Sequence, residues 1–233
     1  MTLATSFRSL IQARHEGGDH SSAARFLREC RDALAPAELS VPAALLADAG
    51  AAQWCREHQL SVDVASVGKL NSAVAADIDP WLLTVDAHGF TAAELAQMAD
   101  LGVGRVVVDD VAQVAELGAC ADQPLDVVVQ QEDSDALDAV VVAVLTRRTL
   151  RLIGVRGGGD PAVAVGLLIE QLDHIRRHHD CLLTRVYLGG VAIGYPQTTA
   201  AGVRAVGVAV DEAATDACAT LRFPRPVVVI GPS

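Results

Sequence analysis

Eight short runs of β-branched and other apolar residues alternate with longer segments of helical periodicity, and this alternation constrains the fold more than any other feature. Several runs, such as 106–108 and 127–129, are apolar at every position, which indicates strands buried on both faces of a parallel sheet. Eight βα steps in about 190 residues predict a single closed (β/α)8 barrel of the TIM type; the alternative is an open doubly wound sheet of the flavodoxin or Rossmann kind. The expected strands are 39–45, 61–65, 81–85, 105–109, 126–130, 150–155, 184–188 and 227–230.

The intervening segments contain recognisable helix ends. Thr91 and Glu94 have the spacing of a capping box, and Asp160-Pro161 is typical of an N-cap followed by proline at the first helical position. The segment 21–34 has Phe26, Leu27 and Leu34 on one face, and we expect it to plug the barrel bottom or to lead into the first strand. Further helices are expected at 135–145, 163–175 and 203–221, with helix ends at Gly50, Gly102 and Gly118.

We expect a lead-in segment at residues 1–20 and one barrel domain at 21–233. The net charge of −11 argues against binding to nucleic acid or anionic lipid. The longest apolar run, 139–145, is far shorter than the roughly 20 residues of a membrane span. No secretory signal is evident in residues 1–20. No pair of the five cysteines has CxxC spacing, which predicts no zinc site and a cytoplasmic location; they are Cys30, Cys55, Cys120, Cys181 and Cys218.

Polar residues follow nearly every expected strand, and active sites of such barrels collect at these carboxyl ends. We take Lys69, Asp86, His88 and Arg156 as the candidate catalytic residues; Lys69 is the only lysine of the chain. The full ring of strand-end residues also includes Asp48, Ser66, Asp109, Asp110, Gln130, Gln131, Gly157, Tyr195, Gly231 and Ser233.

Two glycine clusters lie at strand ends before helices. Gly158 and Gly159 belong to the first cluster, and Gly189 and Gly190 to the second. Backbone N–H groups of such loops can bind an anion at a helix N-terminus. Neither cluster matches a P-loop or a dinucleotide-binding fingerprint.

Glu170, His174 and His178 recur at intervals of four residues on one expected helix. Metal sites use this spacing. The neighbouring Arg176, Arg177 and His179 favour a solvated charged face outside the barrel, so we expect no metal.

Several segments, taken in order, resemble the pyridoxal-phosphate (PLP) barrel of diaminopimelate and ornithine decarboxylases, the alanine-racemase-like fold. VDVASVGKL at 62–70 is similar to that family's DVxSxGEL strand, and LGVGRVVVD at 101–109 to its LGVxRxxVDS. LIGV at 152–155, VYLGG at 186–190 with Gly194-Tyr195, and PVVVIGP at 226–232 resemble its later strands. The resemblance covers residues 21–233 and implies a PLP-dependent decarboxylase ancestry.

The departures from the family pattern fall on its cofactor site. The place of the PLP-binding lysine falls at Ala44 or Leu45, and an alkyl side chain cannot form an imine. The places of the phosphate-binding serine and third glycine fall at Asp160 and Val191. The place of the phosphate-binding arginine falls at Ser233, and that of the catalytic histidine at Arg156 or a neighbouring glycine. We also expect the family's C-terminal β-domain to be missing.

These departures favour a pseudoenzyme: a decarboxylase-like barrel without a functional PLP site that is a partner, regulatory or scaffold subunit of a biosynthetic enzyme, as a dimer or with another protein. The alternative is a rewired enzyme for a small amine or amino acid at the barrel mouth. Such an enzyme would be PLP-free, with Asp48, Asp86, Asp109 and Asp110 attracting the substrate, or would bind PLP at Lys69.

Overall fold

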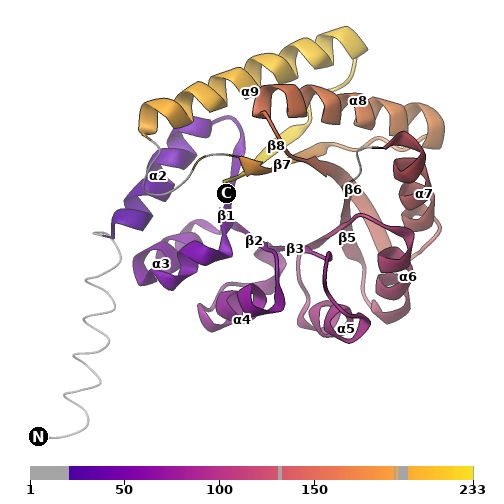
Figure 1. Ribbon diagram of the computed structural model, residues 1–233, viewed down its shortest axis with the longest axis horizontal. Helices are drawn as coiled ribbons and strands as arrows, with labels where there is room; N and C mark the ends of the chain where they lie inside the picture. Colours follow the sequence, from indigo (N-terminus) through magenta and orange to yellow (C-terminus); the bar gives the residue numbers. More distant parts are fainter. Residues whose placement is uncertain (1–20, 131–132, 192, 194–198, 233) are drawn as a thin grey trace, which may run out of the picture.

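The computed structural model describes residues 21–130, 133–191, 193 and 199–232. Its eight strands pair in parallel, each with the next along the chain, and β8 pairs with β1. The ring of strands with helices outside it is visible in Figure 1. The closed (β/α)8 barrel is therefore confirmed, and the open sheet is not what forms. The strands are β1 (Glu38–Pro42), β2 (Ser61–Val64), β3 (Leu83–Asp86), β4 (Arg105–Val108), β5 (Leu125–Val129), β6 (Leu150–Gly157), β7 (Arg185–Val191) and β8 (Val227–Pro232).

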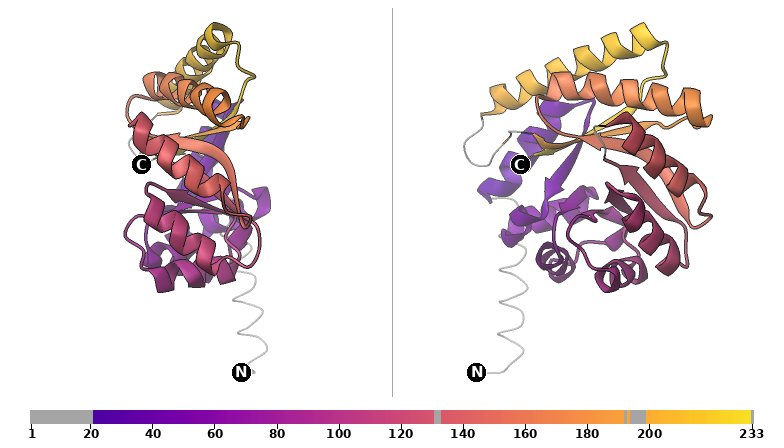
Figure 2. Two further views of the ribbon diagram at one scale, coloured as in Figure 1. Left: turned by 90° about the vertical axis from the view of Figure 1, so that its right-hand side faces the viewer. Right: turned by 45° about the vertical axis from the view of Figure 1, so that its right-hand side comes forward.

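Within the described residues, eight α-helices surround the strands. Seven connect consecutive strands, and α2 (Ser22–Leu34) precedes β1 and packs between α9 and α3. Figure 2 shows α8 and α9 side by side on one flank of the barrel. The helix α2 therefore occupies the eighth position of the outer layer and does not plug the barrel bottom, because its apolar face is buried against neighbouring helices. The others are α3 (Ala49–His58), α4 (Val67–Ala75), α5 (Ala92–Leu101), α6 (Val111–Cys120), α7 (Ser134–Leu145), α8 (Pro161–His179) and α9 (Ala200–Leu221).

Some expected boundaries are wrong, for local reasons. The first strand ends at Pro42, and a 3₁₀ turn, Ala43–Ala47, replaces its expected second half. Gly50 lies at the start of α3, and Gly118 lies inside α6, where an added Cβ would lie 2.3 Å from the side chain of Arg147. Gly118 is therefore a packing residue, whereas Gly102 does end α5 in the left-handed conformation.

The expected caps are present. Thr91 and Glu94 form the reciprocal capping box of α5. Asp160 caps α8, since its Oδ1 accepts hydrogen bonds from the backbone N–H groups of Ala162 and Val163, both at 3.1 Å.

We predict that Asp160→Ala lowers the free energy of unfolding by about 1 kcal/mol, because two N–H groups of α8 lose their acceptor. Asp160→Asn, which keeps an acceptor oxygen, is the control and should cost less. Urea denaturation followed by circular dichroism measures both. Equal losses in the two variants would contradict the capping role.

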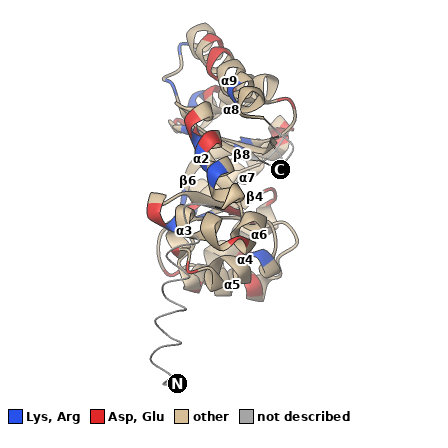
Figure 3. Ribbon diagram, turned by 90° about the vertical axis from the view of Figure 1, so that its left-hand side faces the viewer, with Lys and Arg blue, Asp and Glu red and all other residues tan. Residues whose placement is uncertain are grey.

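Apolar side chains fill two regions, one between strands and helices and one inside the ring of strands. The inner group consists of Val107, Val128, Tyr187 and Val229, with Ile153 against it, and we call it the central layer. Among the described helices, none combines the length and apolarity that crossing a bilayer requires. Figure 3 shows acidic and basic residues interspersed on the outer helices.

Candidate functional site

A cavity of about 1130 Å³ opens at the carboxyl ends of the strands. It lies between the ends of β3 to β6 and the helices α7 and α8, and we call it the mouth cavity. Three of the candidate residues line it or contact its lining: His88 and Arg156 directly, and Asp86 through Arg156. The barrel thus brings together residues that are up to 70 positions apart in the sequence. The remaining polar lining consists of Asp109, Asp110, Gln130, Asp133, Ser134, Glu170, Gln171 and His174.

Arg156 lies at the boundary between the mouth cavity and the interior of the barrel. Its Nη1 is 3.4 Å from Oδ2 of Asp86, and 18% of its side chain is exposed. An added Cβ at Gly189 would lie 2.7 Å from Nε of Arg156, so the guanidinium lies against the backbone of β7. A register shift between β5 and β6 inserts one extra residue before Gly154. Such a bulge changes which face a side chain points to, and this one directs Arg156 inward.

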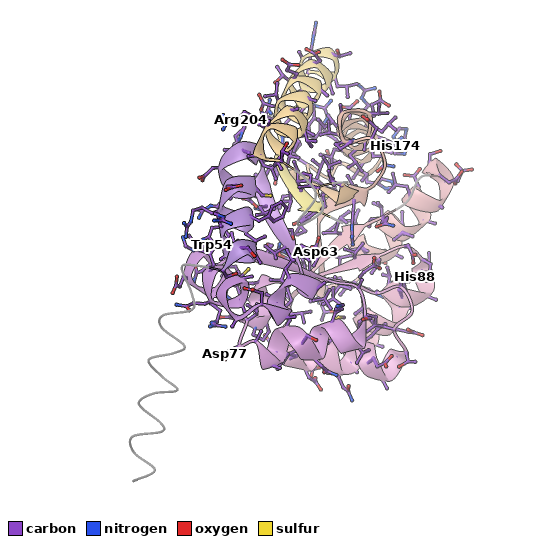
Figure 4. All side chains as sticks on the ribbon, turned by 60° about the vertical axis from the view of Figure 1, so that its left-hand side comes forward. Trp54, Asp63, Asp77, His88, His174 and Arg204 are labelled. Atoms are coloured by element: carbon purple, nitrogen blue, oxygen red, sulfur yellow. The ribbon has the colours of Figure 1, made fainter. Side chains whose placement is uncertain are left out.

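Asp63 is a site residue that sequence analysis missed. It lies inside the ring of strands in Figure 4, and its Oδ1 accepts a 2.7 Å hydrogen bond from the Ser40 hydroxyl. Burial raises the pKa of the Asp63 carboxyl, while the nearby guanidinium of Arg156 and the bond from Ser40 act in the opposite direction. A polar residue at every second position of β1 and β2 was the available signal for inward-facing polar groups.

The space around Asp63 and Arg156 is almost filled. A residual cavity of about 10 Å³ remains between Asp63, Arg156, Tyr187 and Gly231. This is close to the smallest volume that holds one water molecule. The charged groups therefore occupy the centre of the barrel mouth themselves.

His88 forms an ion pair with a second carboxylate at the mouth. Its Nδ1 lies 3.1 Å from Oδ2 of Asp109, and 77% of the His88 side chain is exposed. Asp109 also accepts a 2.5 Å hydrogen bond from Nε2 of Gln113, which holds it in place. Asp110 instead caps α6, where it accepts a hydrogen bond from the Gln113 backbone. His88 and Asp109 therefore form a solvent-accessible hydrogen-bonded pair at the edge of the mouth cavity.

The histidine face of α8 differs from the expectation. His174 and His179 both contact Oδ1 of Asp138 on α7, at 2.9 and 2.6 Å, and His179 is only 12% exposed. The hydrogen bond from His179 has the larger effect, and together with that from His174 it lowers the pKa of Asp138. Glu170 and His174 line the mouth cavity, so this face is not simply solvated. No cluster of three or more metal-ligating side chains occurs among the described residues.

The two glycine clusters do come together. An added Cβ at Gly158 would lie 3.3 Å from the carbonyl oxygen of Gly189. Gly159 and Gly190 both have positive φ, at 104° and 65°, which favours glycine. The N–H groups at the start of α8, however, are already bound by the Asp160 carboxylate.

Other candidates lie apart from the mouth cavity. Lys69 is exposed in the first turn of α4, and its backbone N–H donates to the Ser66 hydroxyl. Asp48 caps α3 and accepts a 2.5 Å hydrogen bond from Ser21. Lys69 and Asp48 therefore belong to the N-terminal ends of α4 and α3 and do not line the mouth cavity. Gln131, Tyr195 and Ser233 lie outside the described residues.

No side chain at the carboxyl end of β1 carries an amine. Ser40 points inward, as its bond to Asp63 shows, and side chains alternate along a strand. Pro42 therefore occupies the last inward position of β1. Ala44 and Leu45, the expected places, lie beyond it in the 3₁₀ turn.

The cysteines are not candidates for nucleophiles. All five are free thiols. Burial raises the pKa of Cys30 and of Cys55 to about 12, so both remain protonated and unreactive at neutral pH.

Comparison with known proteins identifies relatives by sequence. The chain is 32% identical over 128 residues to a diaminopimelate decarboxylase of Actinosynnema pretiosum subsp. auranticum, a match to 55% of this chain and 28% of that enzyme. It is 33% identical over 70 residues to a diaminopimelate decarboxylase of Mycobacterium tuberculosis, which is 30% of this chain and 16% of that enzyme. No family model matches the chain.

Solved structures share the barrel at lower identity. Diaminopimelate decarboxylase from M. jannaschi superposes with a TM-score of 0.74 at 12% identity, over 90% of this chain and 58% of that one. Lysine/ornithine decarboxylase from Vibrio vulnificus, complexed with putrescine, gives 0.70 at 15% identity, over 90% and 60%. The chain thus spans less than two thirds of the length of each of these four proteins.

Proposed function

Because this chain is related to diaminopimelate decarboxylases and has the barrel of the amino-acid decarboxylases, we propose that it is a decarboxylase-like barrel that does not use PLP. We propose further that it is a partner subunit of a biosynthetic enzyme. One observation carries the proposal: the inward position at the end of β1 is Pro42, and Arg156, paired with Asp86, fills the centre of the mouth.

The described residues do not fit PLP. An imine requires a primary amine beside the aldehyde, and the only lysine, Lys69, is exposed on α4 and does not line the mouth cavity. The phosphoryl group would have to approach α8, where the carboxylate of Asp160 already occupies the N–H groups. Repulsion between Asp160 and a phosphate therefore opposes binding.

Titration with PLP tests the first part of the proposal. We expect no imine absorbance at a stoichiometric amount of PLP and no adduct after borohydride reduction, as judged by intact mass. Lys69→Arg is the matched control, since it removes the only lysine and keeps the charge. A stoichiometric adduct that disappears in Lys69→Arg would overturn the proposal in favour of PLP chemistry at Lys69.

An exposed apolar pair beside the mouth cavity supports the partner role. Val163 and Leu167 are 62% and 56% exposed and lie one helical turn apart on α8. Exposed neighbouring apolar side chains often mark protein contacts. Sedimentation velocity of the chain with and without the diaminopimelate decarboxylase of its own organism tests this role. We expect a complex that Leu167→Glu disrupts; no association in the mixture would contradict the choice of partner.

A second candidate function is binding of a small amine at the mouth cavity. Among the described residues, Asp109, Asp110, Asp133 and Glu170 line it together with one arginine, Arg156, and this excess of carboxylates favours a cation. Two of the solved relatives are described with putrescine and with L-lysine. Calorimetric titration with each compound decides: binding that Glu170→Gln weakens supports this candidate, and absence of heat with both removes it.

A further inference from the structure

A second large cavity lies at the opposite end of the barrel, where the strands begin. Its volume is about 1150 Å³, and its lining includes Ser61, Arg105, Asp126, Arg151 and Arg185 at or near the first positions of their strands. We call it the floor cavity. The interior of such barrels is usually filled with branched apolar side chains. A charged and hollow floor therefore needs an explanation other than packing.

Two of its arginines are neutralised by carboxylates of the same cavity. Nε of Arg151 lies 2.5 Å from Oδ1 of Asp126. Both terminal nitrogens of Arg185 donate to Glu38, at 3.0 to 3.1 Å. The charges of Arg151 and Arg185 are therefore balanced by those of Asp126 and Glu38.

Arg105 differs from both. Its Nη1 donates to the hydroxyls of Ser61 at 2.8 Å and Thr84 at 3.4 Å. Its Nε and Nη2 donate no hydrogen bond to any residue in the described part of the chain. A guanidinium presents a planar fork of donors that matches a carboxylate or a phosphate. Nε and Nη2 of Arg105 thus form a fork of donors that has no carboxylate partner among the described residues and that lies in a partly enclosed space.

A buried hydroxyl lies beside this arginine. Tyr187 is 4% exposed, lines the floor cavity, and its hydroxyl has no hydrogen-bond partner of normal geometry among the described residues. Burial raises the pKa of Tyr187, while the guanidinium groups of Arg105 and Arg185 act in the opposite direction; Arg185 lies near the hydroxyl as a donor, which leaves the O–H itself without an acceptor in the described part of the chain. Since the hydroxyl therefore stays protonated at neutral pH, it is available as a donor. An unsatisfied buried donor is uncommon in native proteins.

We propose that the floor cavity binds a small molecule through an oxyanion group, a carboxylate or a phosphate, and that Arg105 and Tyr187 are the residues that hold this group. The Arg105 fork supplies two parallel donors, and the Tyr187 hydroxyl supplies a third. The cavity volume is sufficient for a metabolite-sized ligand. This site is separate from the mouth cavity, because the two cavities share no lining residue among those described.

Tryptophan fluorescence provides a direct test. Trp81 lines the floor cavity and is 49% exposed, whereas Trp54, the only other tryptophan, is buried elsewhere. The protein is titrated in separate arms with inorganic phosphate and with succinate, against chloride at equal ionic strength. We expect a saturable change in one arm, and that arm identifies the oxyanion. Trp81→Phe should remove the signal while calorimetry still detects binding.

Variants make the test specific to Arg105. Arg105→Gln should weaken binding about tenfold or more, since it removes charge-assisted hydrogen bonds. Arg148→Gln is the matched control: Arg148 is exposed near the start of β6, at the same end of the barrel, and does not line the cavity. It should leave affinity within about twofold. Arg105→Lys, which keeps the charge without the fork, replaces Arg105→Gln if that variant does not fold. Absence of saturable binding in both arms, or equal weakening by Arg148→Gln, would overturn the proposal.

Discussion

Gly104→Ala will strongly destabilise the barrel. A Cβ at this position would lie 1.7 Å from the carbonyl oxygen of Trp81 and 2.6 Å from its carbonyl carbon. The backbone N–H of Gly104 also donates to the carbonyl of Pro80 at 3.0 Å, which fixes the two segments together. Because backbone atoms rather than a flexible side chain block the methyl group, β3 and β4 must move apart. We expect a loss of about 3 kcal/mol or more in the free energy of unfolding.

Gly166→Ala is the matched control for this prediction. Gly166 lies within α8, and an added Cβ there meets no atom within 4 Å. Alanine in an open helical position stabilises by up to about 1 kcal/mol. The two identical substitutions should therefore shift the urea midpoint in opposite directions. Similar midpoints for both variants would mean that a methyl group at position 104 fits beside the backbone of Trp81.

Replacement of Arg156 by methionine will be destabilising in a pH-dependent manner. Arg156 is the nearest cation to Asp86 and offsets the effect of burial on the pKa of Asp63. Its removal leaves two carboxylates facing each other in a nearly filled space. We expect a loss at neutral pH of about 2 to 4 kcal/mol, somewhat below the cost of breaking a fully buried pair, because 28% of the Asp86 side chain is exposed.

The sign of the pH dependence follows from Asp63. Its pKa in the folded protein is raised above the ordinary 3.8, so the ionised form opposes folding above that folded pKa, and the penalty is absent below the unfolded value. Loss of Arg156 raises the folded pKa further. The difference between wild type and Arg156→Met should thus shrink as pH falls from 7 toward 4. Urea unfolding across this range measures it.

A double-mutant cycle measures the interaction between Arg156 and Asp63. In an Asp63→Asn background no carboxylate remains at that position, so Arg156→Met should cost less than in the wild type. A constant cost in both backgrounds, independent of pH, would mean that Arg156 stabilises the barrel through packing alone.

The sequence was sufficient to predict the barrel because strand and helix signals repeat eight times and reinforce one another. The caps at Thr91 and Asp160 were predictable for the same reason, since they depend on neighbours within three positions. The carboxyl end of β1 was not predictable. Pro42 ends the strand, and the alanines after it show no periodicity that distinguishes a strand from a turn.

The candidate site was only partly predictable. The strand-end rule identified Asp86, His88 and Arg156, which do meet at the mouth. It missed Asp63, because that rule considers only the ends of strands, whereas Asp63 lies within β2, where the alternation of polar residues was the signal. The inward direction of Arg156 depends on the extra residue of β6 opposite β5, and a one-residue bulge is a property of strand pairing, which propensity does not encode.

The central layer of Val107, Val128, Tyr187 and Val229 lies inside the ring of strands, and its Tyr187 lines both the floor cavity and the residual cavity beside Arg156. Among the described residues, the mouth cavity and the floor cavity share no lining residue, but Arg105 at the floor also acts on the pKa of Asp63 at the mouth. Natural selection or a protein engineer can accordingly replace lining residues of one cavity without replacing any residue that lines the other, and a chain with this architecture can carry separate tasks at its two ends.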